Sequence, residues 1–304
     1  MDSALTPART REISPALFAR FVIAMLVALY LVVTTGAIVR LTASGLGCEN
    51  WPRCGDLPFP ASGGHAFIEF GNRVVALLTI LVCLATWLAA RRVAGLPRFI
   101  RFAALGIFLG TVAQIPLGGL TVIFDLHPLL VMAHFLLAMV VLGVASVLAV
   151  ETWRFVAGAG RPALPPIARR VGVVLALAGF ALIVTGTFVT ASGPHSGGEE
   201  IRRLGVLLDA VYIHVRATAV FGICLLVLGW YVVRARLRAP GLWRASLGLL
   251  VLLGLQMALG EIQYRTHLPW GLVLVHVGLA AAVWSATVAL VTALWRPPAA
   301  LGAK

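Results

Sequence analysis

Three histidines of the chain stand inside long apolar runs, where an uncharged imidazole can act as a ligand to a metal ion. They are His134 in VMAHFLLAMVV, His214 in VYIHVRATAVF and His276 in LVLVHVGLAAAVW. A polar ring in such a run costs free energy unless it has a partner, so each is a candidate functional residue. Two imidazoles facing each other at one level of a helical bundle form an axial ligand pair for a haem iron. His214 and His276 are predicted to form such a pair.

A fourth position, Asn72, belongs to the same spacing. Asn72 and His134 are 62 residues apart, and His214 and His276 are also 62 apart. Asparagine is a poor iron ligand, so Asn72 opposite His134 predicts a site that is weakly ligated or open on one side. An open site suits a substrate or a reacting iron, whereas a closed bis-histidine site suits electron transfer. The two sites are therefore predicted to differ in function.

Glu69 is the remaining candidate for chemistry, three positions before Asn72 and four before Arg73. This spacing places Glu69 and Asn72 on one face of a helix. A carboxylate there can take up a proton or stabilise a cation beside a haem edge. The alternative is a Glu69–Arg73 salt bridge that only anchors the helix end. Arg40, Arg73 and Arg265 are candidate partners for haem propionates, or else interfacial side chains whose heads reach water.

The other histidines, His65, His127, His195 and His267, lie near predicted helix boundaries, where a solvated interfacial residue is the alternative to a ligand. Glu261 stands at a level matching Glu69 and is left unassigned. Cys48 and Cys54 share the predicted outer loop GLGCENWPRCG and form a disulfide, a redox-active pair or two free thiols. Cys83 and Cys224 lie in apolar runs and are interpreted as small buried side chains.

The elements that must position these residues are membrane-spanning helices. Hydrophobic residues make up 61% of the 304 positions and charged residues 12%, with a mean hydropathy of +1.00. Soluble domains carry about 25% charged residues. Apolar runs of about 20 residues are long enough to cross a bilayer. We predict an all-α integral membrane protein with eight transmembrane helices near 19–41, 67–92, 99–123, 127–152, 169–191, 208–233, 242–263 and 268–294.

The distribution of positive charge predicts how these helices are oriented. Of the 24 Lys and Arg residues, 17 fall at the termini or in the even-numbered connections. Positive charge is retained on the cytoplasmic side during insertion, so both termini are predicted to be cytoplasmic. All seven histidines then fall on the outer side or in the outer third of a helix. The net charge of +13 is thus interpreted as a topology signal rather than as a nucleic-acid interface.

An internal repeat divides the helices into two sets. The pair Asn72 and His134 is separated from the pair His214 and His276 by 142 positions, and Gly118 and Gly260 are also 142 apart. In addition, TGAIVRLTASG near the end of the first helix resembles TGTFVTASG near the end of the fifth. Repeats of parallel topology are a known membrane architecture. We predict two pseudo-symmetric four-helix bundles, residues 1–156 with the substrate site and the cysteine pair, and residues 157–304 with the cofactor site.

Taken together, these motifs resemble the bacterial haem A synthase family over nearly the whole chain. The resemblance rests on TGAIVRLTASGLGC with the following WPRC, on EFGNR, on PLGGLTV, on AHFLLA and on the His214–His276 pairing. It implies oxidation of a methyl group of haem O to the formyl group of haem A, by successive hydroxylations, for cytochrome oxidase assembly. It also implies residence in the bacterial cell membrane, with haem O synthase and oxidase assembly factors as candidate partners. A homo-oligomer is left open.

The resemblance also implies roles for single residues. His214 and His276 would ligate a haem b cofactor in the C-terminal bundle, and His134 would ligate the substrate haem in the N-terminal bundle. Glu69 would match the catalytic glutamate of the family, and Cys48–Cys54 its outer-loop disulfide.

One departure from the family pattern concerns the substrate site. Many relatives carry histidine three residues after the glutamate, where this chain has Asn72. His65 could substitute as a ligand, or the iron could be five-coordinate. The rival functions are a dihaem membrane cytochrome that only transfers electrons and a repeat-built transporter. The first would more naturally carry two full bis-histidine pairs, and the second would place its polar residues near the bilayer midplane.

Overall fold

The computed structural model describes residues 12–48, 51–55, 59–60, 63–158, 164–195, 197–198, 201–237 and 239–295. Its regular structure in these ranges consists of eight α-helices: α1 (Pro15–Leu41), α2 (Gly64–Ala90), α3 (Arg98–Ile123), α4 (Pro128–Ala157), α5 (Pro166–Ser192), α6 (Leu207–Arg234), α7 (Pro240–Arg265) and α8 (Trp270–Leu294). All eight are long and apolar enough to cross a membrane. The predicted all-α membrane fold is confirmed.

The helices extend beyond the apolar runs because capping residues decide where they begin and end. α1 begins at Pro15, four residues before the predicted start, because the Ser14 hydroxyl accepts the Leu17 N–H at 3.2 Å. Proline suits this first turn, since its missing N–H has no helical partner there. α4 continues to Ala157 and ends at Gly158, whose φ of 58° is the left-handed conformation that glycine adopts readily.

The α3–α4 and α7–α8 connections have the same backbone form. Each contains two consecutive non-glycine residues with positive φ, 47° and 54° at residues 125–126 and 62° and 59° at residues 267–268. In both, the amide of the second residue donates to the carbonyl five residues earlier, at 2.7 Å. Equivalent residues are 142 apart in the chain. The recurrence supports the predicted internal repeat, while the domain boundaries remain a prediction.

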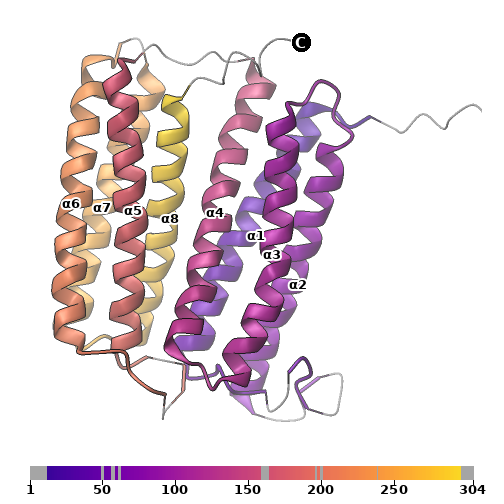
Figure 1. The fold of residues 1–304 in the computed structure, drawn as a ribbon, viewed down its shortest axis with the longest axis vertical. Coiled ribbons are helices and arrows are strands. Elements are labelled where there is room, and N and C mark those ends of the chain that lie inside the picture. The colour runs from indigo at the N-terminus through magenta and orange to yellow at the C-terminus, as the bar shows by residue number, and fades with distance from the viewer. Residues whose placement is uncertain are drawn as a thin grey trace, which may run out of the picture.

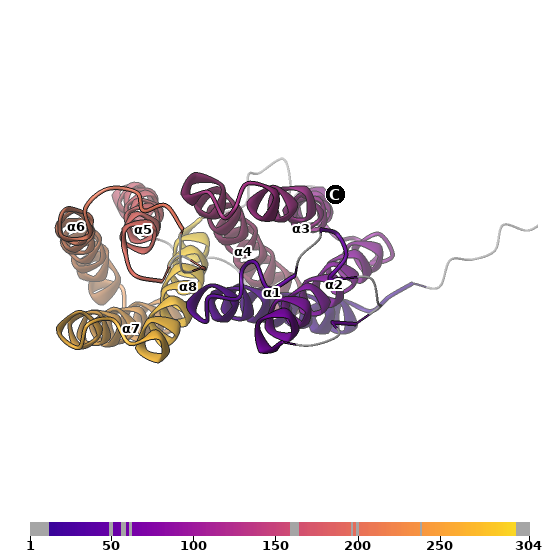
Figure 2. The same ribbon diagram turned by 90° about the horizontal axis from the view of Figure 1, so that it is seen from below.

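Helix contacts place the even-numbered helices diagonally in each half of the chain. α2 and α4 each contact α1 and α3, whereas α6 and α8 each contact α5 and α7. Figure 1 shows α1–α4 and α5–α8 as neighbouring groups, and Figure 2 shows α8 beside α1 and α4. The odd-numbered helices end, and the even-numbered ones begin, at the bottom of Figure 1. We call this the disulfide end, because the loop after α1 carries Cys48 and Cys54.

Hydrogen bonds fix α8 against the helices of the first half. The indole Nε1 of Trp284 donates to the Met139 carbonyl of α4 at 2.7 Å. Gly143 makes room for this ring, since a Cβ there would lie 3.0 Å from Nε1. The Tyr30 hydroxyl of α1 donates to the Gly278 carbonyl of α8 at 3.0 Å. Because Gly278 lies two residues after His276, α1 anchors the helix segment that carries a candidate ligand.

Candidate functional site

The four predicted ligand positions lie at similar depths in the even-numbered helices. Asn72, His134, His214 and His276 stand six to eight residues after the first residues of α2, α4, α6 and α8. At 1.5 Å per residue this is about 9–12 Å from the disulfide end. Asn72 and His134 are on one diagonal pair of helices and His214 and His276 on the other.

Each of these four side chains faces a glycine on the helix that precedes its own. A Cβ added to the glycine would meet the facing side chain at or below ordinary contact distance, so glycine leaves the space that the side chain occupies. The pairs and their distances are Gly36 and Asn72 (4.0 Å to Oδ1), Gly118 and His134 (3.2 Å to Cε1), Gly186 and His214 (3.1 Å to Cε1), and Gly260 and His276 (3.2 Å to Cε1).

Threonines next to two of these glycines hold the facing residues of α2 and α6. The Thr185 hydroxyl lies 2.9 Å from the Leu182 carbonyl and 3.0 Å from Nδ1 of His214. Its single proton goes to the carbonyl, so it accepts the Nδ1–H of His214. This tautomer leaves the Nε2 lone pair of His214 available to an iron. Thr35, the equivalent residue of α1, donates to Oδ1 of Asn72 at 2.7 Å.

Glutamines on α3 and α7 contact the other two candidate ligands. Nε2 of Gln114 donates to the backbone carbonyl of His134 at 3.3 Å, and Nε2 of Gln256 donates to that of His276 at 3.0 Å. Neither glutamine is among the residues predicted from the sequence. They are 142 residues apart, so the repeat offset that relates Gly118 to Gly260 is the signal that could have found them.

The polar atoms of this framework fit a haem between α6 and α8. Within the described ranges, the buried Nδ1 of His276 has no hydrogen-bond partner, and the same holds for His134. A buried imidazole needs partners for both ring nitrogens, and an iron can be the partner of Nε2. The glycines that face His214 and His276 have no side chain, which leaves space for both imidazole rings. Two imidazoles on diagonal helices of one four-helix group match the donor set of a bis-histidine haem b.

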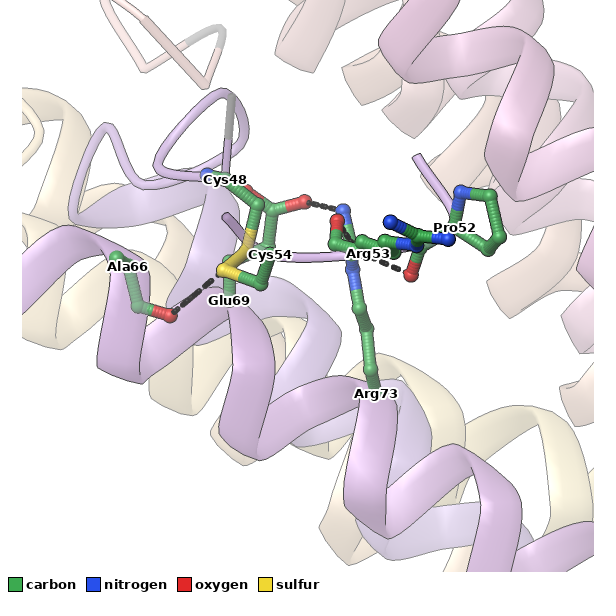
Figure 3. Close-up of a disulfide and its surroundings, with 7 residues drawn as sticks. All are labelled: Cys48, Pro52, Arg53, Cys54, Ala66, Glu69 and Arg73. Carbon is green, nitrogen blue, oxygen red and sulfur yellow. Dashed lines mark hydrogen bonds and ion pairs between the residues drawn. A yellow bond between two sulfur atoms is a disulfide. The ribbon is translucent and has the colours of Figure 1, made fainter. Parts of the chain in front are cut away.

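The carboxylate of Glu69 is buried beneath the disulfide loop. Its side chain belongs to α2, and the residue is 5% exposed. Oε2 accepts the backbone N–H of Cys48 at 2.8 Å, and Oε1 accepts from the Arg73 guanidinium at 2.6 Å. The disulfide between Cys48 and Cys54 is present, as the resemblance implied. Figure 3 shows the loop above this acid. The predicted alternative, a Glu69–Arg73 ion pair, is thus formed, and the catalytic role of Glu69 stays a prediction.

Arg73 joins the same acid to the loop. One of its amino groups, Nη1, donates to the carbonyls of Pro52 and Arg53, at 3.1 and 2.9 Å, as Figure 3 shows. The neighbouring Trp51 packs on α3, where a Cβ at Gly119 would lie 2.7 Å from its ring. The loop is therefore tied to α2 by Glu69 and Arg73 and to α3 by Trp51.

The other two propionate candidates also have protein partners. Arg265 forms an exposed ion pair with Glu261 at 2.5 Å. Glu261, which has no predicted role, is therefore the ion-pair partner of Arg265. Arg40 donates to the Thr190 carbonyl of α5 at 2.5 Å, and within the described ranges its buried Nε lacks a partner. Arg265 also lines an open hollow of about 650 Å³ at the disulfide end, together with Arg203, Tyr264 and His267.

The remaining histidines lie in connections or at helix starts. Nδ1 of His65 is 2.9 Å from the Ser44 hydroxyl, and Nε2 of His195 is 2.7 Å from the Leu268 carbonyl. His127 precedes the first residue of α4, and His267 is one of the positive-φ residues after α7. His65 is seven residues before Asn72, which places it about 10 Å nearer the disulfide end.

Comparisons with known proteins agree with this framework. The COX15-CtaA family model, described as cytochrome oxidase assembly protein, matches residues 19–64. A haem A synthase from Symbiobacterium thermophilum is 26% identical over 270 residues, which cover 84% of this chain and 88% of that protein. A haem A synthase from Geobacillus thermodenitrificans is 33% identical over 120 residues, 39% of this chain and 38% of the relative. One from Geobacillus kaustophilus is 30% identical over 124 residues, also 38% of its length. The aligned stretch thus spans well under half of the two Geobacillus proteins.

Proposed function

With membership of the haem A synthase family supported by these comparisons, we propose that this multi-pass membrane protein converts haem O to haem A. The reaction oxidises a methyl substituent of haem O to the formyl group by successive hydroxylations. The observation that carries the proposal is the inequality of two otherwise matched sites. Glycine faces the ligand position on all four even-numbered helices, but the residue at that position is histidine on three of them and asparagine on the fourth.

The C-terminal site would hold the cofactor, haem b. His214 and His276 would be its axial ligands, with Thr185 fixing the tautomer of His214 through its Nδ1. When bound, a bis-histidine haem supplies one-electron transfer. The hollow beside Arg265 begins at Tyr264, one helical turn beyond Gly260 towards the disulfide end. Arg265 would be the residue that pairs with a propionate of this haem.

The N-terminal site would hold haem O as the substrate. His134 would ligate the substrate iron from α4, while Asn72 on the opposite helix supplies an amide instead of an imidazole. The Asn72 oxygen is already hydrogen-bonded to Thr35 at 2.7 Å. This supports a substrate iron with one protein ligand and one open side. Arg40 and Arg73 would be the propionate partners nearest to this site.

Glu69 would act in the reaction from α2, one turn nearer the disulfide end than Asn72. Its two oxygens hold the Cys48 amide and the Arg73 guanidinium. The carboxylate would take up a proton or stabilise positive charge at the edge of the substrate. The same bonds orient the acid, because they leave it little rotamer freedom.

We further propose that both termini are cytoplasmic and that the haem sites lie in the outer half of the bilayer. The excess of Lys and Arg in the connections remote from the disulfide end supports this orientation. Haem O synthase and oxidase assembly factors would be partners, since haem O must be supplied and haem A must be delivered.

Extraction and chromatographic identification of the haems tests the function directly. The chain is expressed with a supply of haem O and purified with its native haems. We expect haem b together with haem O, haem A or a hydroxylated intermediate. Two equivalents of haem b alone, despite available haem O, would instead establish a cytochrome that only transfers electrons. In a second preparation, His276→Ala should lose the low-spin haem b signal; retention of that signal would exclude the bis-histidine pairing.

A further inference from the structure

Two pairs of complementary polar atoms lack partners at matching places in the two halves. Within the described ranges, neither Nδ1 of His134 nor Oε1 of Gln114 has a hydrogen-bond partner, although both atoms are buried. The same is true of Nδ1 of His276 and Oε1 of Gln256. One atom of each pair can donate and the other can accept. Such pairs are rare, since most buried polar groups in proteins are hydrogen-bonded.

The geometry brings each pair to one helix contact. A Cβ at Gly260 would lie 3.7 Å from Nδ1 of His276, so this nitrogen faces α7. Gln256 is one turn before Gly260 on α7, and its Nε2 already bonds the His276 backbone carbonyl at 3.0 Å. The Gln256 side chain and Nδ1 of His276 therefore belong to the same contact between α7 and α8.

The first half repeats this arrangement residue for residue. A Cβ at Gly118 would also lie 3.7 Å from Nδ1 of His134. Gln114 precedes Gly118 by one turn and donates to the His134 carbonyl at 3.3 Å. The same residue types with the same unpartnered atoms occur at an offset of 142, on α3 and on α7. A packing accident on one helix would not recur on the other.

We propose that Gln114 and Gln256 are positioning residues that accept the Nδ1–H of His134 and His276 when these histidines bind haem iron through Nε2. A histidine that ligates a metal almost always donates its other N–H to an acceptor, which fixes the ring and raises its basicity. His214 already has this acceptor in Thr185. The proposal supplies the missing acceptor for the other two imidazoles, and it rests on the haem-binding function proposed above.

The acceptor affects the electronic properties of the iron. An acceptor on Nδ1–H makes the imidazole a stronger electron donor through Nε2, which favours the ferric state and lowers the midpoint potential. A carboxylate at residue 256 would strengthen this effect, and an aliphatic side chain would abolish it. Gln256 therefore sets the potential of the cofactor without touching the iron.

Potentiometric titration and electron paramagnetic resonance of the purified holoprotein test the proposal. Gln256→Leu should retain haem b, raise its midpoint potential and shift its low-spin ferric g-values, whereas Gln256→Glu should lower the potential. Gln114→Leu is the matched control, because it removes the equivalent side chain of the substrate site and should leave the haem b potential unchanged. If Gln256→Leu does not fold, the direction of the change in haem b midpoint potential in Gln256→Glu tests the proposal alone.

The outcomes separate this inference from the function on which it rests. A wild-type haem b signal that depends on His276, with unchanged potential and g-values in both Gln256 variants, would overturn the acceptor role and leave the haem assignment standing. Equal shifts of the haem b potential in Gln256→Leu and Gln114→Leu would also overturn it, since the effect would not be local. A wild-type protein without low-spin haem b would contradict the proposed function itself.

Discussion

The backbone N–H of Cys48 donates to Oε2 of Glu69 at 2.8 Å, so the buried acid of α2 is bonded directly to one end of the disulfide. A second α2 residue, Arg73, bonds the same acid and two carbonyls of the enclosed loop. The loop, the acid and the arginine therefore form one hydrogen-bonded unit beside the predicted substrate site. Perturbing any of the three should affect the other two.

Replacement of the acid by its amide tests the catalytic role of Glu69. Glu69→Gln keeps an oxygen that can accept the Cys48 N–H but removes the charge and the ability to take up a proton. We expect haem A formation to fall by about 10²-fold or more, the size of a general acid–base contribution, with the haem b spectrum intact. The measurement is the haem A content of the expressed variant.

The matched control for this substitution is Glu261→Gln. Glu261 and Arg265 form the same i, i+4 ion pair on α7, but the Glu261 side chain is 59% exposed, compared with 7% for Glu69. Its replacement should change stability by less than about 0.5 kcal/mol and leave haem A formation unchanged. Normal haem A output from Glu69→Gln would remove the acid from the reaction.

Removal of the disulfide should loosen the loop without unfolding the helices. Closure of a ring with a sequence separation of 6 constrains the loop by about 2 kcal/mol, which corresponds to roughly 30-fold more open loop when the bond is lost. A Cys48→Ser, Cys54→Ser double variant should then be cleaved by trypsin after Arg53 about that much faster. Cys224→Ala is the control, and an unchanged rate in the double variant would show that Glu69 and Arg73 alone hold the loop.

Conversion of Asn72 to histidine should close the open side of the substrate site. Thr35 already contacts this position, as Thr185 contacts His214. We expect Asn72→His to turn the iron of bound haem O from five-coordinate high-spin to six-coordinate low-spin. Magnetic circular dichroism distinguishes the two states. A low-spin substrate haem in the wild-type protein would contradict the open site, because it would indicate a second protein ligand to the iron.

The glycines that face the imidazoles should not tolerate even one methyl group. A Cβ at Gly260 would lie 3.2 Å from Cε1 of His276, and one at Gly186 would lie 3.1 Å from Cε1 of His214. Either alanine substitution should displace the ring and reduce the low-spin haem b recovered per protein. Gly254→Ala on α7 is the control, because nothing lies within 4 Å of its added Cβ. Full haem b occupancy in Gly260→Ala would show that the His276 imidazole can move to accommodate the methyl group and still bind haem.

Much of the fold follows from the sequence because long apolar runs and flanking charges leave few alternatives to membrane-spanning helices. All eight predicted runs overlap helices, and their ends differ because caps such as Ser14 lie outside the apolar pattern. The Cys48–Cys54 disulfide, left open by spacing alone and implied by the family resemblance, is present.

The parts that could not be predicted depend on side-chain direction. Spacing placed Glu69 beside Arg73, but it could not show that both oxygens of the acid are engaged, because Cys48 is distant in sequence. The contact of Arg40 with the Thr190 carbonyl joins α1 to α5 across 150 positions. Gln114 and Gln256 were not predicted as site residues because an uncharged amide within an apolar run does not stand out by its charge, although the repeat offset relates the two.

The matching backbone turns after α3 and α7 bear on how such a protein can arise. Two turns with the same left-handed pairs, at a fixed offset, are what the duplication of a gene for four helices would leave behind. The two copies differ at the ligand position of their first even-numbered helix, where the first half carries Asn72 and the second half carries His214.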